Sequence, residues 1–333
     1  MLMRLIGKLG FIFLTLVGVN AMAEKPSISV TADSFPAIPE MVTSFGAAAT
    51  NNAVYLYGGH TGRAHQYSSE TQANTLWRLD LEKPNAWESL GDGPGLQGLA
   101  MVTHGGKLYR IGGFTAKNRD GEDADLWSQA NVSAYDPTTK VWSELAPLPE
   151  PRSSFDAAVL GNQIYVVGGW SMQGDGESKW HKSAYVLDLD QPQPQWQALP
   201  VPPFQRRALS LAAHDGKIYV LGGMGQNGGI SKRVDIYDPR TKSWSRGPSL
   251  EGEDMDGFGS SAFAVGGQLY ASTYSGLLQR LSADGESWEV LKELELDRFF
   301  HRLLPLASNK LMAIGGASMS SGKFDEVEVI RIQ

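Results

Sequence analysis

The chain has 333 residues, 42% of them apolar and 20% charged, which is the composition of an ordinary globular protein and unlike that of disordered or collagen-like chains. Its net charge of −7 argues against a nucleic-acid partner, because an acidic surface repels phosphate backbones. It has no cysteine, which excludes disulfides and thiolate metal sites.

The chain begins with the features of an export signal. Two basic residues, Arg4 and Lys8, precede an apolar run over residues 9–19, and Ala21-Met22-Ala23 forms a small-x-small cleavage motif. A retained membrane anchor is the alternative, but the run is short for a span of about 20 residues.

We therefore expect residues 1–23 to be a signal peptide and the mature chain to begin at Glu24, with no stable membrane anchor after cleavage. Removing Arg4 and Lys8 from the 29 basic residues leaves 27 against 36 acidic ones, a net charge of −9. The lack of cysteine suits a bacterial exported protein, so we expect a periplasmic or secreted location.

An apolar strand that ends in two glycines recurs along the rest of the chain. The copies are VYLYGG (54–59), LYRIGG (108–113), IYVVGG (164–169), IYVLGG (218–223) and LMAIGG (311–316), and a degenerate copy, LYASTY, occupies 269–274. Six copies spaced by about 50 residues indicate a repeat architecture.

Each unit contains four predicted strands. Small residues such as Ala47-Ala48 precede the Gly-Gly strand, an Asp-Pro turn follows it in VSAYDPTTKVW (132–142) and VDIYDPRTKSW (234–244), and a Trp begins the fourth strand. Apolar runs of this kind suit sheets that are covered on both faces, as in six sheets packed radially. The glycines would let the backbones of neighbouring sheets approach closely.

The last unit lacks its Trp strand, because the chain ends at VEVIRIQ (327–333). Residues 27–36 align with a fourth strand that has no first three strands before it. We expect this segment to complete the last sheet and close the ring, which would remove exposed sheet edges. Residues 24–333 are thus predicted to form one all-β, six-bladed propeller.

The repeated Gly-Gly, Tyr-Asp-Pro and Trp pattern resembles that of the kelch-repeat β-propellers over almost all of the mature chain. The resemblance implies that the loops after Gly-Gly and the connections between units share one face, around the mouth of a central channel, and that this face is the ligand site. The first three units have the longest loops after Gly-Gly, so we expect a mouth walled on that side.

Arginine and aromatic side chains are the candidate ligand-binding residues at this mouth. They are Arg152, Arg206, Arg207, Arg298, Arg302, Trp170, His60 and Tyr274. Guanidinium groups suit carboxylate or phosphate, and exposed aromatic rings stack on sugars. The alternative for the arginines is pairing with acids between blades, and for Trp170 it is packing over a neighbouring blade.

His301 and Asp256 are the candidate residues for proton transfer at the mouth, although nothing in the sequence fixes their geometry. The acidic loop 118–125 lacks the residue order of a calcium loop, and no two histidines have metal-ligand spacing. We therefore predict no metal and no cofactor.

Kelch propellers include interaction modules, a copper oxidase and a sugar mutarotase, so the fold leaves the function open. A galactose-oxidase type of enzyme is disfavoured because its crosslinked cysteine is absent. The favoured prediction is an exported module that binds an unknown protein or a carbohydrate, including an anionic sugar. The alternative is a periplasmic sugar-acid mutarotase or epimerase resembling N-acetylneuraminate epimerase, with arginines holding the carboxylate and an acid or histidine moving the ring-opening proton.

Overall fold

The computed structural model describes residues 26–31 and 35–333, so the predicted signal peptide and residues 32–34 of the predicted closing segment lie outside the described residues. The described residues form β-strands and two short 3-10 helices, η1 (Ser69–Thr71) and η2 (Asp254–Gly257). Nowhere in residues 26–31 and 35–333 does a helix reach the length and apolarity that crossing a membrane requires.

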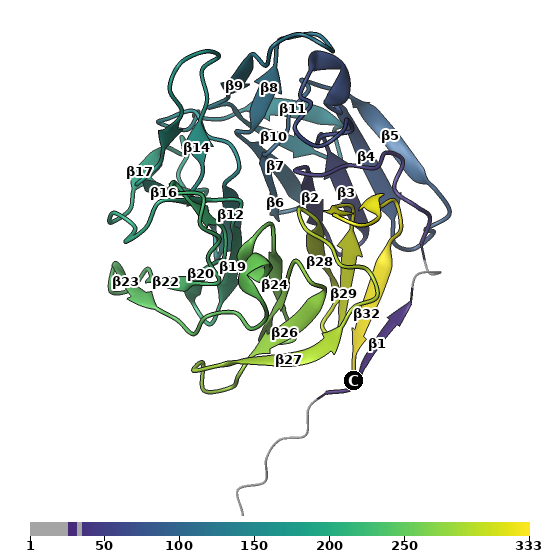
Figure 1. The fold of residues 1–333 in the computed structure, drawn as a ribbon, viewed down its shortest axis with the longest axis vertical. Coiled ribbons are helices and arrows are strands. Elements are labelled where there is room, and N and C mark those ends of the chain that lie inside the picture. Colours follow the sequence, from purple (N-terminus) through teal and green to yellow (C-terminus); the bar gives the residue numbers. More distant parts are fainter. Residues whose placement is uncertain (1–25, 32–34) are drawn as a thin grey trace, which may run out of the picture.

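Six four-stranded antiparallel sheets surround a central axis as the blades of a propeller (Figure 1). Blade 1 contains β2 (Gly46–Ala49), β3 (Ala53–Tyr57), β4 (Thr75–Asp80) and β5 (Trp87–Asp92). Blade 2 contains β6 (Ala100–His104), β7 (Lys107–Ile111), β10 (Val132–Asp136) and β11 (Val141–Glu144). Blade 3 contains β12 (Asp156–Leu160), β13 (Gln163–Val167), β16 (Ala184–Asp188) and β17 (Trp196–Ala198).

The remaining blades follow in chain order. Blade 4 contains β19 (Ser210–His214), β20 (Lys217–Leu221), β22 (Val234–Asp238) and β23 (Ser243–Arg246). Blade 5 contains β24 (Ser261–Val265), β25 (Gln268–Ser272), β26 (Leu277–Leu281) and β27 (Trp288–Glu293). Blade 6 contains β28 (Arg302–Ala307), β29 (Lys310–Ile314), β32 (Glu328–Ile332) and β1 (Ile28–Thr31). The six-bladed kelch-type fold is therefore confirmed.

The N-terminal strand closes the ring, as predicted. β1 pairs antiparallel with β32 from Ile28 opposite Ile332 to Thr31 opposite Val329. The inner strands β2, β6, β12, β19, β24 and β28 contact one another in that order, and β28 contacts β2. Blade 6 is thus built from both ends of the described chain. Its fourth strand is β1, which pairs with the edge of β32 that would otherwise lack a partner strand.

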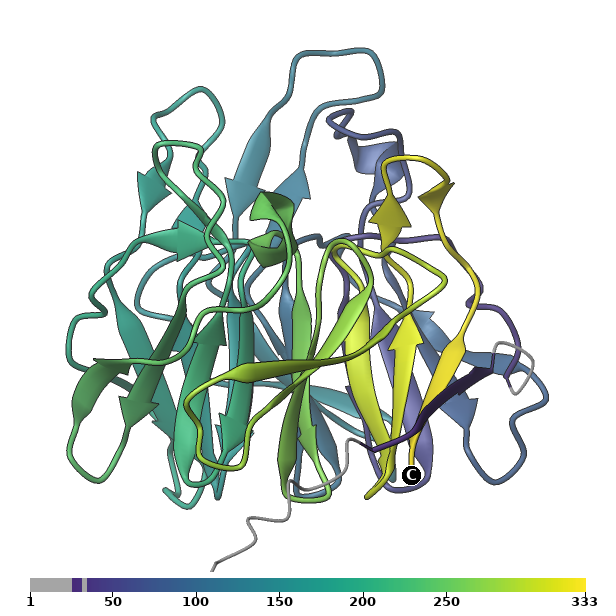
Figure 2. The same ribbon diagram turned by 60° about the horizontal axis from the view of Figure 1, so that its bottom comes forward.

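The two ends of the propeller differ. Tight hairpin turns lie at one end, while long loops and small additional sheets rise from the other end, which we call the loop face (Figure 2). These additional sheets pair β8 (Phe114–Ala116) with β9 (Leu126–Ser128), β14 (Trp170–Ser171) with β15 (Lys179–Trp180), β18 (Arg206–Arg207) with β21 (Met224–Gly225), and β30 (Ala317–Ser318) with β31 (Gly322–Lys323). Blade 6 therefore also carries a raised hairpin, which the loop lengths of the first five units did not predict.

The Gly-Gly pairs lie where neighbouring blades meet. Gly112 has a φ of +54°, and a Cβ atom there would lie 2.6 Å from the carbonyl oxygen of Arg152 and 3.0 Å from the ring of Phe155 in the next blade. Such distances leave no room for a side chain, and the positive φ disfavours any residue with a Cβ. The glycines thus allow the apolar residue of the next blade to pack against the end of the Gly-Gly strand.

Four of the five repeated Trp residues attach the fourth strand of their blade to the connection before that blade. The indole N–H of Trp196 donates to the carbonyl oxygen of Ala146 at 2.9 Å, and that of Trp244 donates to Pro200 at 2.8 Å. Trp87 and Trp288 make the equivalent bonds to Pro36 and Pro248. These buried or half-buried indoles therefore serve the fold rather than a ligand.

Candidate functional site at the channel mouth

A ring of six residues, one from each blade, narrows the channel at the loop face. They are Ser44, Gly98, Ser154, Ala208, Gly259 and Phe300, each with a φ between 52° and 59°. Backbone hydrogen bonds of 2.6 to 3.2 Å link consecutive members, from the Phe300 N–H through to the Ser44 carbonyl. We call this ring the collar. Four of its members carry side chains in the left-handed region, so tertiary packing and not local preference sets this conformation.

The collar gives the mouth a narrow floor. The cavity at the collar has a volume of about 50 Å³, whereas the channel beyond it encloses about 290 Å³. The collar therefore separates the loop face from the channel, and a ligand larger than a few water molecules would stay on the loop face. We call the area of the loop face between the raised loops, above the collar, the bowl (Figure 2).

Arg302 lies beyond the collar, inside the channel, whereas the sequence prediction placed it at the mouth. Its Nη1 forms an ion pair with the Asp156 carboxylate of blade 3 at 2.9 Å. Its Nε and Nη2 donate to the carbonyl oxygens of Phe45 in blade 1 and Leu99 in blade 2, at 3.3 and 3.4 Å. This one side chain from blade 6 joins three other blades, so its role in the structure is to hold the ring together.

Arg152, Arg206 and Arg298 occupy the same position in blades 3, 4 and 6, and they are 0%, 4% and 1% exposed. Each donates from Nη1 to the carbonyl oxygen of the first glycine in its own blade, at 2.6 Å for Arg152 and 2.8 Å for Arg298. Burial lowers the pKa of Arg152 and of Arg206 to about 10. These guanidinium groups are inside the blades and out of reach of a ligand.

The acids that balance these arginines are close in the same blade or in the preceding segment. Asp235 pairs with Arg206, Glu328 pairs with Arg298, and Glu150 lies 3.6 Å from Arg152. For these three arginines the pairing is therefore within blades, whereas the alternative interpretation of pairing between blades holds for Arg302 with Asp156. The pairing within blades fixes the turn after each of these Gly-Gly strands.

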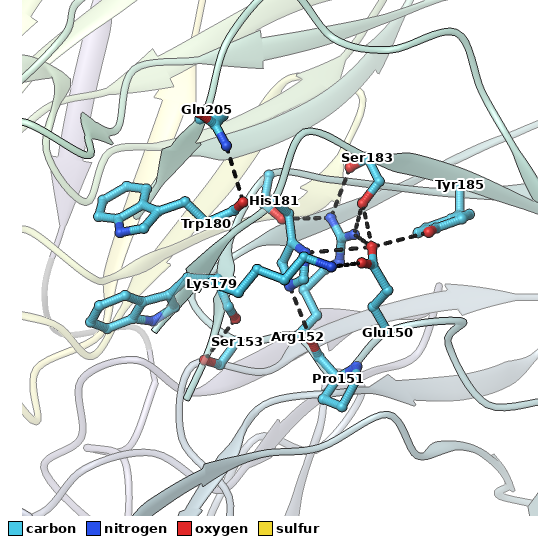
Figure 3. Close-up of polar contacts among 12 residues, drawn as sticks. Glu150, Pro151, Arg152, Ser153, Lys179, Trp180, His181, Ser183, Tyr185 and Gln205 are labelled. Atoms are coloured by element: carbon cyan, nitrogen blue, oxygen red, sulfur yellow. Dashed lines mark hydrogen bonds and ion pairs between the residues drawn. The ribbon is translucent and has the colours of Figure 1, made fainter. Parts of the chain in front are cut away.

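Glu150 is the centre of a polar cluster at the edge of the loop face (Figure 3). Its carboxylate accepts hydrogen bonds from the hydroxyls of Ser183 at 2.6 Å and Tyr185 at 3.1 Å, and from the Lys179 ammonium. Burial alone would raise the pKa of Glu150, but these donors hold it at about 2. Burial and the Arg152 charge lower the pKa of the neighbouring His181 to about 4, so that this imidazole is neutral near pH 7.

The two candidate proton-transfer residues are both enclosed. His301 is 2% exposed and replaces the Phe that follows the collar residue in blades 1 and 3, and neither of its ring nitrogens has a partner among the described residues. Burial and the charges of Arg298 and Arg302 lower its pKa to about 3. Asp256 is 1% exposed and accepts hydrogen bonds from the backbone of Glu253 and from Ser275, so it holds η2 against blade 5.

His60 also serves the fold. It is 4% exposed, and its two ring nitrogens lie 3.2 Å and 2.9 Å from the carbonyl oxygens of Thr71 and Arg63. It therefore anchors the loop after the first Gly-Gly. In residues 26–31 and 35–333 no group of three or more His, Asp or Glu side chains could hold a metal ion.

The residues immediately before the collar form a second ring, which we call the rim. They are Thr43, Gln97, Ser153, Arg207, Phe258 and Phe299. Most of them pair with the residue that follows Gly-Gly in the same blade, as Ser153 does with Trp170 and Arg207 with Met224. The rim is polar over blades 1–3, cationic at blade 4 and aromatic over blades 5 and 6.

Arg207 is the candidate arginine that stays at the mouth. Its guanidinium carbon lies 4.3 Å from the ring centre of Trp170 and 5.5 Å from that of Trp180, and the two indoles meet edge to face at 5.7 Å. No carboxylate among the described residues pairs with it, and its Nε has no hydrogen-bond partner there. Burial raises the pKa of Tyr67, from the blade 1 loop, while the charge of Arg207 opposes that rise, which places this phenol near the guanidinium.

Aromatic rings continue the mouth over blades 5 and 6. Tyr274 stacks on Phe299 with a centroid distance of 5.3 Å and an interplanar angle of 19°. Phe258 meets Phe300 edge to face at 4.9 Å. The mouth therefore combines Arg207, which has no acid partner among the described residues, with neighbouring aromatic rings over blades 5 and 6.

Of the ten sequence-predicted residues, the structure brings Arg207, Trp170 and Tyr274 to the mouth. Sequence reasoning missed Tyr67, Trp180, Phe258 and Phe299. An alignment of the units on the left-handed collar residue, rather than on the glycines alone, would have placed Phe258 and Phe299 beside Arg207.

The comparisons with known proteins agree with the repeat pattern. The KLHDC2/KLHL20/DRC7 Kelch-repeats domain model matches residues 98–316. Kelch-like protein 35 of Mus musculus is 27% identical over 65% of this chain and 32% of its own length. F-box/kelch-repeat protein At1g67480 of Arabidopsis thaliana is 30% identical over 60% of this chain and 50% of its own length.

The chain spans only about a third to a half of the length of these curated relatives. Among solved structures, that of YjhT superposes with a TM-score of 0.72, covering 90% of this chain and 99% of that one. At 16% identity this similarity shows a common fold alone. With the family model covering most of the propeller, the chain belongs to the kelch-repeat β-propeller family.

Proposed function

We propose that this protein is an exported kelch propeller that binds a partner in the bowl of its loop face. The observation that carries the proposal is the rim, where half-buried aromatic rings and one arginine without an acid partner surround a floor closed by the collar. Exposed aromatic clusters beside an arginine are typical of binding surfaces. Kelch propellers typically bind protein partners, which adds support.

The mutarotase alternative has less support. It required several arginines around one sugar carboxylate and a histidine or acid within reach of the ring oxygen. Arg152, Arg206 and Arg298 are engaged inside their blades, and His301 and Asp256 are enclosed. Of the five candidate arginines, Arg207 alone has no acid partner among the described residues and stays available for the carboxylate.

Export is the part of the proposal that rests on the sequence of residues 1–23. The basic start, the apolar run and the Ala-x-Ala motif support it. Cell fractionation of the natural host tests it directly, because the chain should be found outside the inner membrane.

Selection of binding peptides from a phage-displayed random library on the immobilised protein tests the binding role. Trp180→Ala and Tyr274→Ala, both on the loop face, should abolish capture of the enriched phage. Arg240→Ala is the matched control on the hairpin end, where Arg240 is 76% exposed, and it should leave capture unchanged. Capture that survives both loop-face substitutions would overturn the proposal.

A further inference from the structure

The channel beyond the collar is a cavity with an opening of its own, and we call it the well. It encloses about 290 Å³, roughly twenty times the volume that one water molecule needs, and the collar cavity of about 50 Å³ closes it toward the loop face. The inner strands that wall it are buried near the collar and half-buried at their far ends, as in β2 from Gly46 to Ala49 and β12 from Asp156 to Leu160. The well therefore opens at the hairpin end.

Each inner strand turns one backbone edge toward the well, because alternate residues of an antiparallel strand direct their N–H groups away from the partner strand. In blades 4, 5 and 6 the second residue of the inner strand donates this N–H to the side chain that begins the inner strand of the preceding blade. The bonded pairs, at 2.9 to 3.0 Å, are Leu211 with Asp156, Ala262 with Ser210, and Leu303 with Ser261. Side chains of the protein thus satisfy the donors on this half of the wall.

The other half of the wall lacks these acceptors. The equivalent N–H groups of blades 1, 2 and 3 belong to Ala47, Met101 and Ala157. The preceding inner strands begin with Arg302, Gly46 and Ala100, whose side chains have no hydrogen-bond acceptor. Three backbone donors in consecutive blades therefore lack an acceptor among the described residues of the propeller. Donors of this kind favour a ligand that brings acceptor oxygens.

Arg302 adds two more donors at the same level of the well. Its guanidinium bonds to the carbonyl oxygens of Phe45 and Leu99, each of which lies two residues before one of the free N–H groups. Together with the bond to Asp156 these use three of the five guanidinium N–H groups, and the side chain is 21% exposed. Both oxygens of Asp156 are occupied, by Arg302 and by the Leu211 N–H. This side of the well thus presents a cation and free donors, while the acceptors beside them are taken.

The ligand that fits these groups has two acceptor oxygens and one negative charge. A carboxylate accepts from a guanidinium N–H and from backbone N–H groups at the same time. Arg302 and Asp156 are the charged residues among those that line the well, and because their charges cancel, a dianion such as phosphate gains little there. Val102, Phe263 and Leu304 give the wall toward the hairpin end an apolar surface, and Phe263 is 38% exposed. A short alkyl chain can pack against that surface.

We propose that the well binds a small monocarboxylate that enters from the hairpin end. Its oxygens accept from Arg302 and from the free N–H groups of blades 1 to 3, and its alkyl chain lies along the apolar wall toward the opening. The site is on the opposite side of the collar from the bowl, so it is independent of the proposed partner-binding function.

Methyl NMR of the protein with ¹³C-labelled methionine and sodium butyrate as the probe tests the proposal. Met101 lines the well, so its signal should shift saturably with butyrate, whereas Met224 and Met255 on the loop face should not respond. Butyramide and 1-butanol are the matched neutral probes, and they should bind at least tenfold more weakly than butyrate because they lack the charge.

Ala100→Ser tests the free donors without touching the ion pair. It places a hydroxyl where blades 4 and 5 have serine, so it should bond to the Ala157 N–H and weaken butyrate binding at least fivefold. Gly46 is unsuitable for the same change, because a Cβ there would lie 2.9 Å from that of Met101. Arg302→Met should remove the preference for butyrate over butyramide. Arg240→Gln is the control and should bind butyrate as the unsubstituted protein does.

Circular dichroism establishes that each variant is folded at the temperature of the titration. A Met101 signal that butyrate leaves unshifted, or that butyramide shifts at the same concentrations, would overturn the inference, and so would unchanged butyrate binding by folded Ala100→Ser. Displacement of butyrate by sulfate or phosphate at lower concentration than by propionate would overturn it in favour of an inorganic anion. The loop-face proposal is judged separately, by phage capture.

Discussion

The Arg302–Asp156 pair should contribute measurably to the closure of the propeller. The first residue of the inner strand is a serine in blades 4 and 5. Ser210 accepts a hydrogen bond from the backbone N–H of Ala262 in blade 5 at 3.0 Å, and Ser261 accepts one from that of Leu303 in blade 6 at 2.9 Å. Blade 1 has Gly46 at the equivalent position and has no such link. Arg302 reaches across the space that the small residues leave and bonds to blades 1, 2 and 3 instead.

Replacing Arg302 with Met keeps most of its aliphatic volume and removes all three bonds. Breaking a buried ion pair on one side costs about 3–5 kcal/mol. Here Arg302 is 21% exposed and Asp156 keeps the hydrogen bond from Leu211 N–H at 2.9 Å, so we expect a loss of about 2–3 kcal/mol in the free energy of unfolding. Asp156→Ser restores the residue type of blades 4 and 5 and should recover part of that loss in the double variant.

Urea unfolding followed by tryptophan fluorescence and by circular dichroism measures these differences, because coincident curves permit a single free energy. The double-mutant cycle should give a coupling energy between Arg302 and Asp156 of about 1–3 kcal/mol. A loss below about 0.5 kcal/mol for Arg302→Met, within the range of ordinary surface substitutions, would refute the reasoning.

Three further predictions concern the other arginines, His301 and export. Arg298→Gln should lower the free energy of unfolding by about 3 kcal/mol or more, because it leaves Glu328 buried without its cation. Arg207→Gln should change the free energy of unfolding by less than about 1 kcal/mol, because it breaks no ion pair among the described residues. Thermal melts of the two variants measure the difference. His301→Phe should raise the thermal midpoint. The pKa of His301 is about 3 in the folded state and about 6.5 in the unfolded state, so the unfolded state binds more protons between these values. Acidification from pH 7 to pH 5 should therefore lower the free energy of unfolding by about 2 kcal/mol through this residue, and His301→Phe should abolish that loss. A thermal midpoint that depends equally on pH in both proteins would contradict this. Mass spectrometry of the exported protein should find Glu24 as its first residue, and an uncleaved chain would contradict the signal-peptide prediction.

The fold could be predicted from the sequence because its strongest determinants are local and repeated. In five of the six units a Gly-Gly pair ends the strand against which the next blade packs, as Phe155 does against Gly112, and these pairs recur about every 50 residues over the first four units. The closing strand could be predicted from a missing element at one end and an extra one at the other. Both arguments need only the order of residues along the chain.

The candidate site could be predicted only in part, because residue type does not reveal which partner a side chain finds. Arg206 and Arg207 are adjacent in sequence and alternate in direction along β18, so one points into the blade and the other to the mouth. His301 has the residue type of an acid-base group, yet its position behind the collar encloses it. Tyr67 lies in the loop between β3 and β4, whose sequence is not repeated in the other blades, so the repeat pattern could not predict its position.

The central claim is that binding takes place in the bowl, at Arg207, and leaves the channel beyond the collar unchanged. Methyl NMR of the protein with ¹³C-labelled methionine tests this most directly, because Met224 pairs with Arg207 and Met255 is exposed on η2, three residues before Phe258, while Met101 lines the channel and Met312 is in the core. On addition of a synthetic peptide with the sequence enriched in the phage selection, we expect the Met224 and Met255 signals to shift, those of Met101 and Met312 to stay, and Arg207→Gln to abolish the shifts. Shifts confined to Met101, or shifts at Met224 that persist in Arg207→Gln, would contradict the account.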